Sequence, residues 1–248
     1  MGPNQQTKPD YGIDAPGIGL AVLLAVIVGL AVGLFLRGSS NQLARITAAI
    51  VLNLLPAGLI LIVLMVVYVK VEKFRHRDRM LNMLSWKGNE QVLDVGTGRG
   101  LLMIGAAKRL TEGKSFGIDI WSRTDLSGNT REAAMRNAQL EGVEDRVEIK
   151  NADARNLPFA DHSFDYVLSN LCLHNIDSRE ARDAACREIA RILRPGGVAL
   201  ISDFRYTKEY AAAFAEQELE VTRSLALLLA PMLLRIVKAR KKQAMNHP

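Results

Sequence analysis

The sequence predicts an α/β domain with a largely parallel sheet, preceded by a hairpin of two membrane-spanning helices. Two runs without any charged residue, 15–36 and 46–69, lie close together near the N-terminus. After residue 80, short apolar runs alternate with helical segments, a pattern typical of a parallel sheet covered on both faces. A glycine-rich turn joins the first predicted strand to the helix that follows it.

Composition narrows the possible classes of function. The 248 residues suffice for one or two domains, and a hydrophobic content of 49% excludes a disordered chain. Cys172 and Cys186 are the two cysteines, too few for a disulfide-stapled fold, which favours a reducing compartment. The net charge of +6 divides into +4 for 1–79, −4 for 80–220 and +6 for 221–248. The basic excess therefore flanks an acidic body, which argues against a nucleic-acid-binding surface.

Each charge-free run is long enough to cross a bilayer, because about 20 apolar residues span its hydrocarbon core as a helix. Neither run has one polar face or a period of two, so both are predicted to be helices that are apolar all round. Gly29 and Gly33 form a small-xxx-small pair through which the helices can approach closely. The alternatives are a hairpin buried in a soluble core and a cleaved signal peptide. Two long charge-free runs in tandem argue against a buried hairpin, and the presence of a second span after the first argues against a signal peptide.

Basic residues around the two runs predict their orientation. The segment 70–79 contains five basic residues and the connection 37–45 contains two. By the positive-inside rule, the N-terminus and everything after residue 70 face the cytoplasm. We therefore expect an N-terminal tail at 1–14, two transmembrane helices within 15–69 and a basic juxtamembrane helix or linker at 70–84. The α/β domain follows at 85–240, with a tail at 241–248.

Within the domain, the expected strands are 91–95, 115–118, 147–150, 164–169 and 198–202, and the expected helices are 101–110, 130–141 and 178–193. Ser178 is a suitable N-cap for the last helix, and the breakers at 194–197 end it. The stretch 218–239 is either a β-hairpin that closes the sheet or an amphipathic helix on the membrane. Apolar and β-branched residues on both sides of Pro231 favour the hairpin.

The segment 92–100, Val-Leu-Asp-Val-Gly-Thr-Gly-Arg-Gly, carries the strongest functional signal. Glycine allows a tight turn and a close approach of backbone N–H groups to a ligand, and the helix N-terminus favours a negative group. The dinucleotide fingerprint would need glycine where Leu101 stands, and the Gly-Lys-Ser/Thr of a P-loop is absent. Asp94, inside the strand, suits a ligand with an ammonium group better than a pyrophosphate.

Acids also follow the next two strands. Asp119 lies about 20 residues after the glycines, where a carboxylate can accept hydrogen bonds from ribose hydroxyls. Asp153, at the end of the third strand, can hold an exocyclic amine. The glycine loop and the strand ends together suggest a ligand in which an amino acid is joined to a nucleoside.

Together with 157–159 (Leu-Pro-Phe), 164–170 and 193–197, these segments resemble the class I S-adenosylmethionine-dependent methyltransferases, of the type 11 kind. The resemblance covers 85–240. It implies a Rossmann-like methyltransferase sheet of seven strands, mostly parallel with an antiparallel last strand, and S-adenosyl-L-methionine as cofactor. The cofactor-binding residues that it implies are Asp94, Gly96, Thr97, Gly98, Gly100, Asp119, Ile120, Asp153, Ala154 and Asn170.

Methyl transfer from a sulfonium needs alignment and exclusion of water, and it needs a general base only where the acceptor carries a proton. Asn170, His174 and Asp203 follow strands at the expected site, and we take His174 and Asn170 as the catalytic candidates. A structural role for His174, capping the next helix, is the alternative. No metal site is expected. Asn170 lacks the following Pro-Pro that is typical of amide and adenine N-methylation in this superfamily.

The sequence thus predicts a membrane-anchored methyltransferase that acts on a small or lipophilic acceptor at the cytoplasmic face, without a nucleic-acid partner. One alternative is a catalytically silent membrane scaffold with a methyltransferase fold, against which the intact Asp94, Asp119 and glycines argue. The other is a nucleic-acid or protein methyltransferase, against which the acidic body argues. The loop 121–129 is expected to cover the cofactor.

Overall fold

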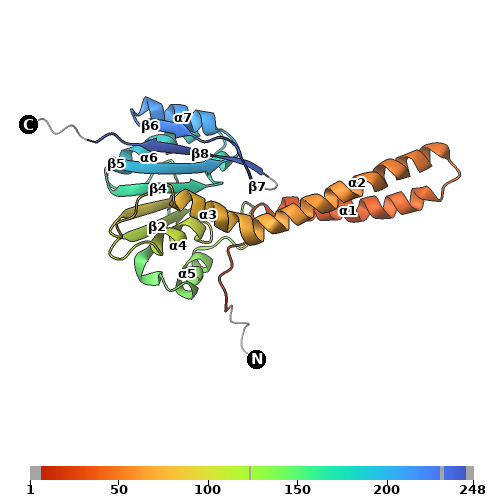
Figure 1. Cartoon of the computed structure of the whole chain (residues 1–248), viewed down its shortest axis with the longest axis horizontal. Coiled ribbons are helices and arrows are strands. Elements are labelled where there is room, and N and C mark those ends of the chain that lie inside the picture. The colour runs from red at the N-terminus through yellow and green to blue at the C-terminus, as the bar shows by residue number, and fades with distance from the viewer. Residues whose placement is uncertain (1–6, 123, 230–231, 244–248) are drawn as a thin grey trace, which may run out of the picture.

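The computed structural model describes residues 7–122, 124–229 and 232–243. It shows an α/β domain from which a long helical hairpin projects (Figure 1). Parts of the two predicted tails, and the predicted break at Pro231, lie outside the described residues.

The hairpin consists of α1 (Pro16–Arg37) and α2 (Gln42–Val67). Helix α2 begins four residues before the predicted span because Asn41 caps it, accepting hydrogen bonds from the N–H groups of Leu43 and Ala44. The two helices pack closely: a Cβ added to Gly33 would lie 2.7 Å from Leu52 Cδ2. In the most apolar 18-residue stretch of each helix, only 6% of the residues are buried in α1 and none in α2. The apolar side chains of the hairpin therefore face outward.

The second arm of the hairpin continues into the domain without a break. A π-helical turn, η1 (Tyr68–Glu72), leads from α2 directly into α3 (Lys73–Leu81). Helix α3 packs on the sheet through Met80 and Leu81, which are fully buried. The segment predicted as a juxtamembrane helix or linker is therefore helical as far as Leu81 and part of the core.

The sheet has the strand order β3-β2-β1-β4-β5-β8-β6, with a short β7 paired to β8. Its first five strands are parallel, and β8 runs antiparallel to both β5 and β6. The strands are β1 (Gln91–Val95), β2 (Lys114–Asp119), β3 (Val147–Asn151), β4 (Phe164–Asn170), β5 (Leu193–Asp203), β6 (Glu220–Arg223), β7 (Leu227–Leu229) and β8 (Met232–Arg240). The β-hairpin interpretation of 218–239 is confirmed, and the amphipathic helix is wrong.

The domain helices are α4 (Leu101–Ala107), α5 (Arg131–Leu140), α6 (Arg179–Ile192) and α7 (Thr207–Glu216), with the short η2 (Glu144–Arg146) and η3 (Leu173–Asn175) between them. Ser178 caps α6 as predicted, accepting from Ala181 N. Helix α7 was not predicted, because its N-cap, Tyr206, makes no capping hydrogen bond through its side chain. Helix α6 ends just before the predicted breakers at 194–197, as expected, and these residues belong to the start of β5.

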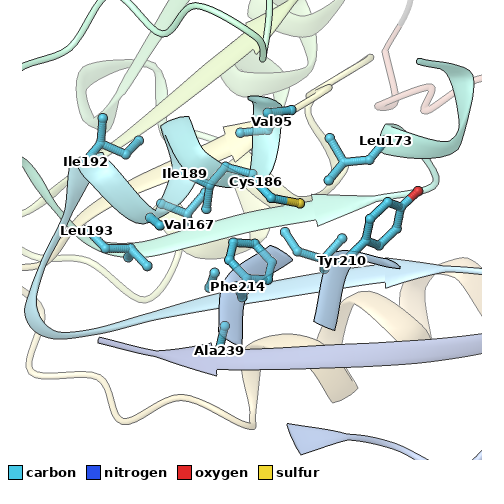
Figure 2. Close-up of a cluster of buried hydrophobic side chains, with 14 of the residues drawn as sticks. Val95, Val167, Leu173, Cys186, Ile189, Ile192, Leu193, Tyr210, Phe214 and Ala239 are labelled. Atoms are coloured by element: carbon cyan, nitrogen blue, oxygen red, sulfur yellow. The ribbon is translucent and has the colours of Figure 1, made fainter. Parts of the chain in front are cut away.

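Helices cover both faces of the sheet, because neighbouring residues of the central strands point to opposite sides. Val167 packs on the side of α6 and α7, and the next residue, Leu168, packs on the side of α3 and α4. Figure 2 shows the first of these layers, where Phe214 and Tyr210 of α7 meet Ile189 of α6 above the strands. Burial on both faces leaves the ends of the strands as the place for a site.

Candidate functional site

A cavity lies at the carboxyl ends of β1, β2, β3 and β4, where ligands bind in open α/β sheets. The glycine loop after β1 and the loop after β2 line it on one side. The segment after β4 lines it on another. The predicted cofactor residues that line the cavity are Asp94, Gly96, Thr97, Gly98, Asp119, Ile120, Asp153, Ala154 and Asn170.

The glycine loop is held tightly against neighbouring backbone. The N–H groups of Gly96 and Thr97 both donate to Ile118 O at 2.9 Å. Gly96 has φ +73°, and a Cβ built on it would fall 2.2 Å from Cys172 Sγ, so glycine is required there. Gly100 does not line the cavity; with φ +87° it forms the left-handed N-cap of α4.

Asp94 connects the glycine loop to the helix after it. Its Oδ2 accepts hydrogen bonds from Thr97 Oγ1 and Met103 N, each at 2.9 Å. Burial raises the pKa of this carboxyl to about 7, and the nearby charge of Asp119 acts in the same direction. A cationic group entering the cavity would favour the ionised form. The geometry is therefore compatible with the predicted ammonium partner and also gives Asp94 a structural task.

Asp119 fastens the loops on its side of the cavity. Its Oδ2 accepts from Gly98 N at 2.8 Å, and its Oδ1 accepts from Trp121 N at 2.6 Å. The loop 121–129, expected to cover the cofactor, lines the cavity through residues that include Asn129, while Arg123 lies outside the described residues. Asp153 lines the cavity as well, and its pairing with the Arg155 guanidinium at 2.5 Å lowers the pKa of the carboxyl.

The two catalytic candidates lie in different surroundings. Asn170 lines the cavity, and its Oδ1 is buried without a hydrogen-bond partner. His174 is not among the residues that line it. The His174 Nδ1 atom lies 2.9 Å from Oδ1 of the fully buried Asp203, and its ring packs edge-on against Phe204. These contacts tie the segment after β4 to the end of β5 and so give His174 a structural role. It is not the predicted role as a helix cap, since Ser178 is the N-cap of the next helix, α6.

Four residues that the sequence did not single out also line the cavity: Tyr11, Asp14, Tyr68 and Lys73. They belong to the segments immediately before α1 and after α2. Lys73 is 4% exposed, and its Nζ donates to the carbonyl oxygens of Tyr11 at 3.1 Å and Gly12 at 2.6 Å. Lys73 was interpreted only as a topology signal, since no local pattern predicts a contact across about 60 residues.

We call residues 10–15 the strap, because they lie across the glycine loop and the loop 121–129. The Asn137 side chain makes two hydrogen bonds to the backbone of Asp10. Its Oδ1 accepts from Asp10 N at 2.9 Å, and its Nδ2 donates to Asp10 O at 2.8 Å. Ala15 N donates to Asp125 O at 2.8 Å, and Ser127 N donates to Ile13 O at 3.0 Å. The predicted N-terminal tail is therefore, over these residues, an ordered part of the site.

Known families and curated proteins show which proteins this domain is similar to. Residues 93–201 match the family described as a methyltransferase domain. Over 129 residues the chain is 35% identical to the methyltransferase GfsG of Streptomyces halstedii, which covers 52% of this chain and 43% of that protein. It is 34% identical over 144 residues to the 27-O-demethylrifamycin SV methyltransferase of Amycolatopsis mediterranei, covering 58% of this chain and 49% of that protein.

A third curated relative is the ubiquinone/menaquinone biosynthesis C-methyltransferase of Dinoroseobacter shibae, 30% identical over 52% of this chain and 48% of that protein. The chain thus spans about half the length of the curated relatives it matches. The matched family region, 93–201, lies after the apolar hairpin.

Solved structures share the fold. A SAM-dependent methyltransferase from Methanosarcina mazei superposes with a TM-score of 0.55 at 18% identity, covering 67% of this chain and 98% of that one. The [4+2]-cyclase SpnF superposes with a TM-score of 0.57 at 19% identity, covering 69% and 81%.

Over residues 93–201 the domain is thus similar to methyltransferase domains, and S-adenosylmethionine is the cofactor that this similarity implies. The residues present fit that molecule. Backbone of the loop 96–98 borders the cavity without side chains at Gly96 and Gly98. Asn170, whose buried Oδ1 has no hydrogen-bond partner among the described residues, lines it as well.

Proposed function

We propose that this chain is a membrane-anchored methyltransferase, which transfers a methyl group from S-adenosylmethionine to a small or lipophilic acceptor at the cytoplasmic face. One observation carries the proposal. The cavity that holds the predicted cofactor residues is also lined by Tyr68, the first residue after α2, and by Asp14, two residues before α1. The site and the base of the apolar hairpin are thus one structure.

Each part of the cavity has an assigned task in this proposal. The glycine loop and Asp94 would hold the methionine part of the cofactor, Asp119 the ribose, and Asp153 with Ala154 the adenine. When bound, the cofactor supplies an electrophilic methyl group on a sulfonium. The chain's own contribution is to align the acceptor with that group and to exclude water, which the strap and the loop 121–129 support by their position over the cavity.

The exposure of α1 and α2 supports membrane anchoring. A helix hairpin of a soluble core would be buried, whereas these helices carry exposed side chains such as Ile18 (62%), Leu54 (64%) and Phe35 (83%). The five basic residues of 70–79 support a cytoplasmic domain with the N-terminus on the same side. Gly29 and Gly33 would mediate the pairing of the two spans.

The relatives support a small-molecule acceptor. The curated names include a methyltransferase for demethylrifamycin SV and C-methyltransferases of quinone biosynthesis, so relatives of this domain act on small organic molecules. The fold by itself does not establish methyl transfer, since the cyclase SpnF shares it. Cofactor binding and product labelling must therefore be measured separately.

The first experiment is calorimetric titration of the full chain, in detergent, with S-adenosylmethionine. We expect binding, and its loss in Asp119→Ala, because that carboxylate lies in the cavity. Asp145→Ala is the matched control, since that side chain is 76% exposed and outside the cavity. Absence of binding by the unmodified chain would refute the enzyme proposal and leave the silent scaffold.

The second experiment tests location and acceptor class. Membranes containing the chain are extracted with alkaline carbonate, from which a protein with two spans stays in the pellet. The same membranes are then incubated with S-adenosylmethionine labelled in the methyl group. Label in the organic extract supports a lipophilic acceptor, whereas label in protein or nucleic acid supports the alternative methyltransferase classes.

A further inference from the structure

Among the described residues, three that line the cavity have a buried side-chain oxygen without a hydrogen-bond partner: Asp14 Oδ2, Asn129 Oδ1 and Asn170 Oδ1. Asn129 lies on the cofactor side, where its Nδ2 donates to Asp119 Oδ1 at 3.4 Å. A buried acceptor without a donor costs free energy comparable to a lost hydrogen bond, so such atoms mark places where a ligand donates. Asn170 also belongs to the predicted cofactor set. Asp14 does not, and it lies on the strap rather than on any strand end of the sheet.

Tyr68 shows where this part of the cavity lies. Its side chain is 3% exposed and packs beside Leu171, the neighbour of Asn170. Its phenol is also within electrostatic reach of the Asp14 carboxylate. Asp14, Tyr68 and Asn170 therefore surround the same end of the cavity, and the chain enters α1 and leaves α2 at this end.

Charge at this end of the cavity selects against charged ligands. Lys73 Nζ lies 4.0 Å from Asp14 Oδ2, so an ammonium placed on that oxygen would meet a like charge. The Lys73 ammonium is itself committed to the carbonyl oxygens of Tyr11 and Gly12 and does not offer a free anion site. Asp94 and Asp119 line the same cavity and disfavour an anion further.

We propose that Asp14, Tyr68 and Asn170 form the acceptor subsite, and that it takes the neutral, hydroxyl-bearing head group of a lipophilic molecule whose apolar part lies along the hairpin. This inference rests on the proposed function and adds to it the place and the class of the acceptor. The hydroxyl would donate to Asp14 Oδ2. Lys73, through the strap carbonyls, acts as a positioning residue that keeps this carboxylate in the cavity.

The test uses the full chain in phosphatidylcholine nanodiscs saturated with S-adenosylhomocysteine. Binding of decanol, decyl methyl ether, decylamine and decanoate is measured by calorimetry, with empty nanodiscs subtracted. We expect decanol to bind about tenfold more tightly than the ether, since a hydrogen bond to a charged group is lost in the ether. We expect the amine and the carboxylate to bind no better than the ether.

Asp14→Ala should reduce the ratio of decanol to ether affinity to about one while S-adenosylhomocysteine still binds. Glu72→Ala is the control, because Glu72 is an acid beside Lys73 that pairs with Arg75 and does not line the cavity. Equal affinity for decanol and the ether in the unmodified chain, or an unchanged ratio in Asp14→Ala, overturns the subsite. Preferred binding of the amine or the carboxylate also overturns it. Failure of the unmodified chain to bind S-adenosylhomocysteine would instead refute the proposed function.

Discussion

The two ends of the cavity are built in different ways. The end that holds the glycine loop, Asp119 and Asp153 is made of loops that directly follow β1, β2 and β3 and is closed by short-range bonds, such as Thr97 to Asp94. The end beside the hairpin joins segments about 60 residues apart, through the bonds from Lys73 to the strap. The first end depends on the sheet alone, whereas the second exists only when the helices and the strap are in place.

The largest effect is expected from Gly96→Ala, at the cofactor end. An added Cβ meets Cys172 Sγ at 2.2 Å on a backbone with φ +73°. The left-handed backbone costs about 1–2 kcal/mol and overpacking about 1–3 kcal/mol more. We expect loss of S-adenosylmethionine binding in calorimetry and a clear fall in the unfolding temperature.

Gly142→Ala is the matched control for this change. Gly142 also has a positive φ, of +65°, but an added Cβ there meets nothing within 4 Å. It should therefore show only the backbone cost of about 1–2 kcal/mol and keep cofactor binding. Equal losses in the two variants would mean that strain, and not the contact with Cys172, makes glycine necessary at 96.

The second prediction concerns pH and Asp94. Burial raises the pKa of Asp94 from 3.8 to about 7, so between these values the folded chain holds a proton that the unfolded chain has lost. This group's contribution to the free energy of unfolding is therefore full below about pH 4 and is lost as the pH rises through 7, by at most about 1.4 kcal/mol per pH unit. Asp94→Asn should flatten that slope in denaturant titrations between pH 5 and 7.

Cofactor binding should show the opposite pH dependence. The ammonium group of S-adenosylmethionine favours the ionised carboxylate, so affinity should rise with pH through about 7, with proton release on binding at pH 6. Calorimetry in buffers of different ionisation enthalpy measures that release. Affinity that is independent of pH in the unmodified chain would show that Asp94 acts only through Thr97 and Met103.

The difference between the two ends also explains how much the sequence could predict. The glycine spacing, Asp94 and Asp119 are local features of strand–loop–helix units, so the parallel sheet and the lining of the cofactor end followed from them. Lys73 and Asp14 carry no such local signal, because what places them is a contact between chain segments on either side of the hairpin. Helix α7 was missed for a similar reason: packing of Tyr210 and Phe214 in the core, and not a capping residue, stabilises it.

The third prediction tests whether the two ends are separable. Lys73→Met removes the donors to Tyr11 and Gly12, at a cost of about 1–3 kcal/mol. We expect faster hydrogen exchange of the strap amide of Ala15 and of the Ser127 amide, which donates to the strap, and loss of the preference for decanol over its ether. Affinity for S-adenosylhomocysteine should change less than about threefold, since the hydrogen bonds that hold the glycine loop join it to Ile118, Asp94 and Asp119 rather than to Lys73.

Lys70→Met provides the control for the lost charge, because Lys70 is an exposed lysine one turn earlier on the same helix that does not line the cavity. It should leave both exchange and ligand preference unchanged. If Lys73→Met accelerated exchange of the strap and also weakened S-adenosylhomocysteine binding well beyond threefold, the cavity would be one cooperative unit. The proposed difference between its two ends would then be wrong.

The smallest effect is expected where the two ends touch directly, at the ion pair of Arg99 Nη1 in the glycine loop and Asp10 Oδ2 in the strap, 3.0 Å apart. The Asp10 side chain is 59% exposed and that of Arg99 only 10%, so water screens the pair from the side of Asp10 and we expect it to contribute about 1 kcal/mol, the upper end for surface pairs. Asp10→Asn should thus change S-adenosylhomocysteine affinity by less than about fivefold, and the change should vanish in high salt, which screens the pair. A larger, salt-independent loss would mean that the strap holds the glycine loop in its binding geometry, so that the membrane hairpin controls the cofactor end as well.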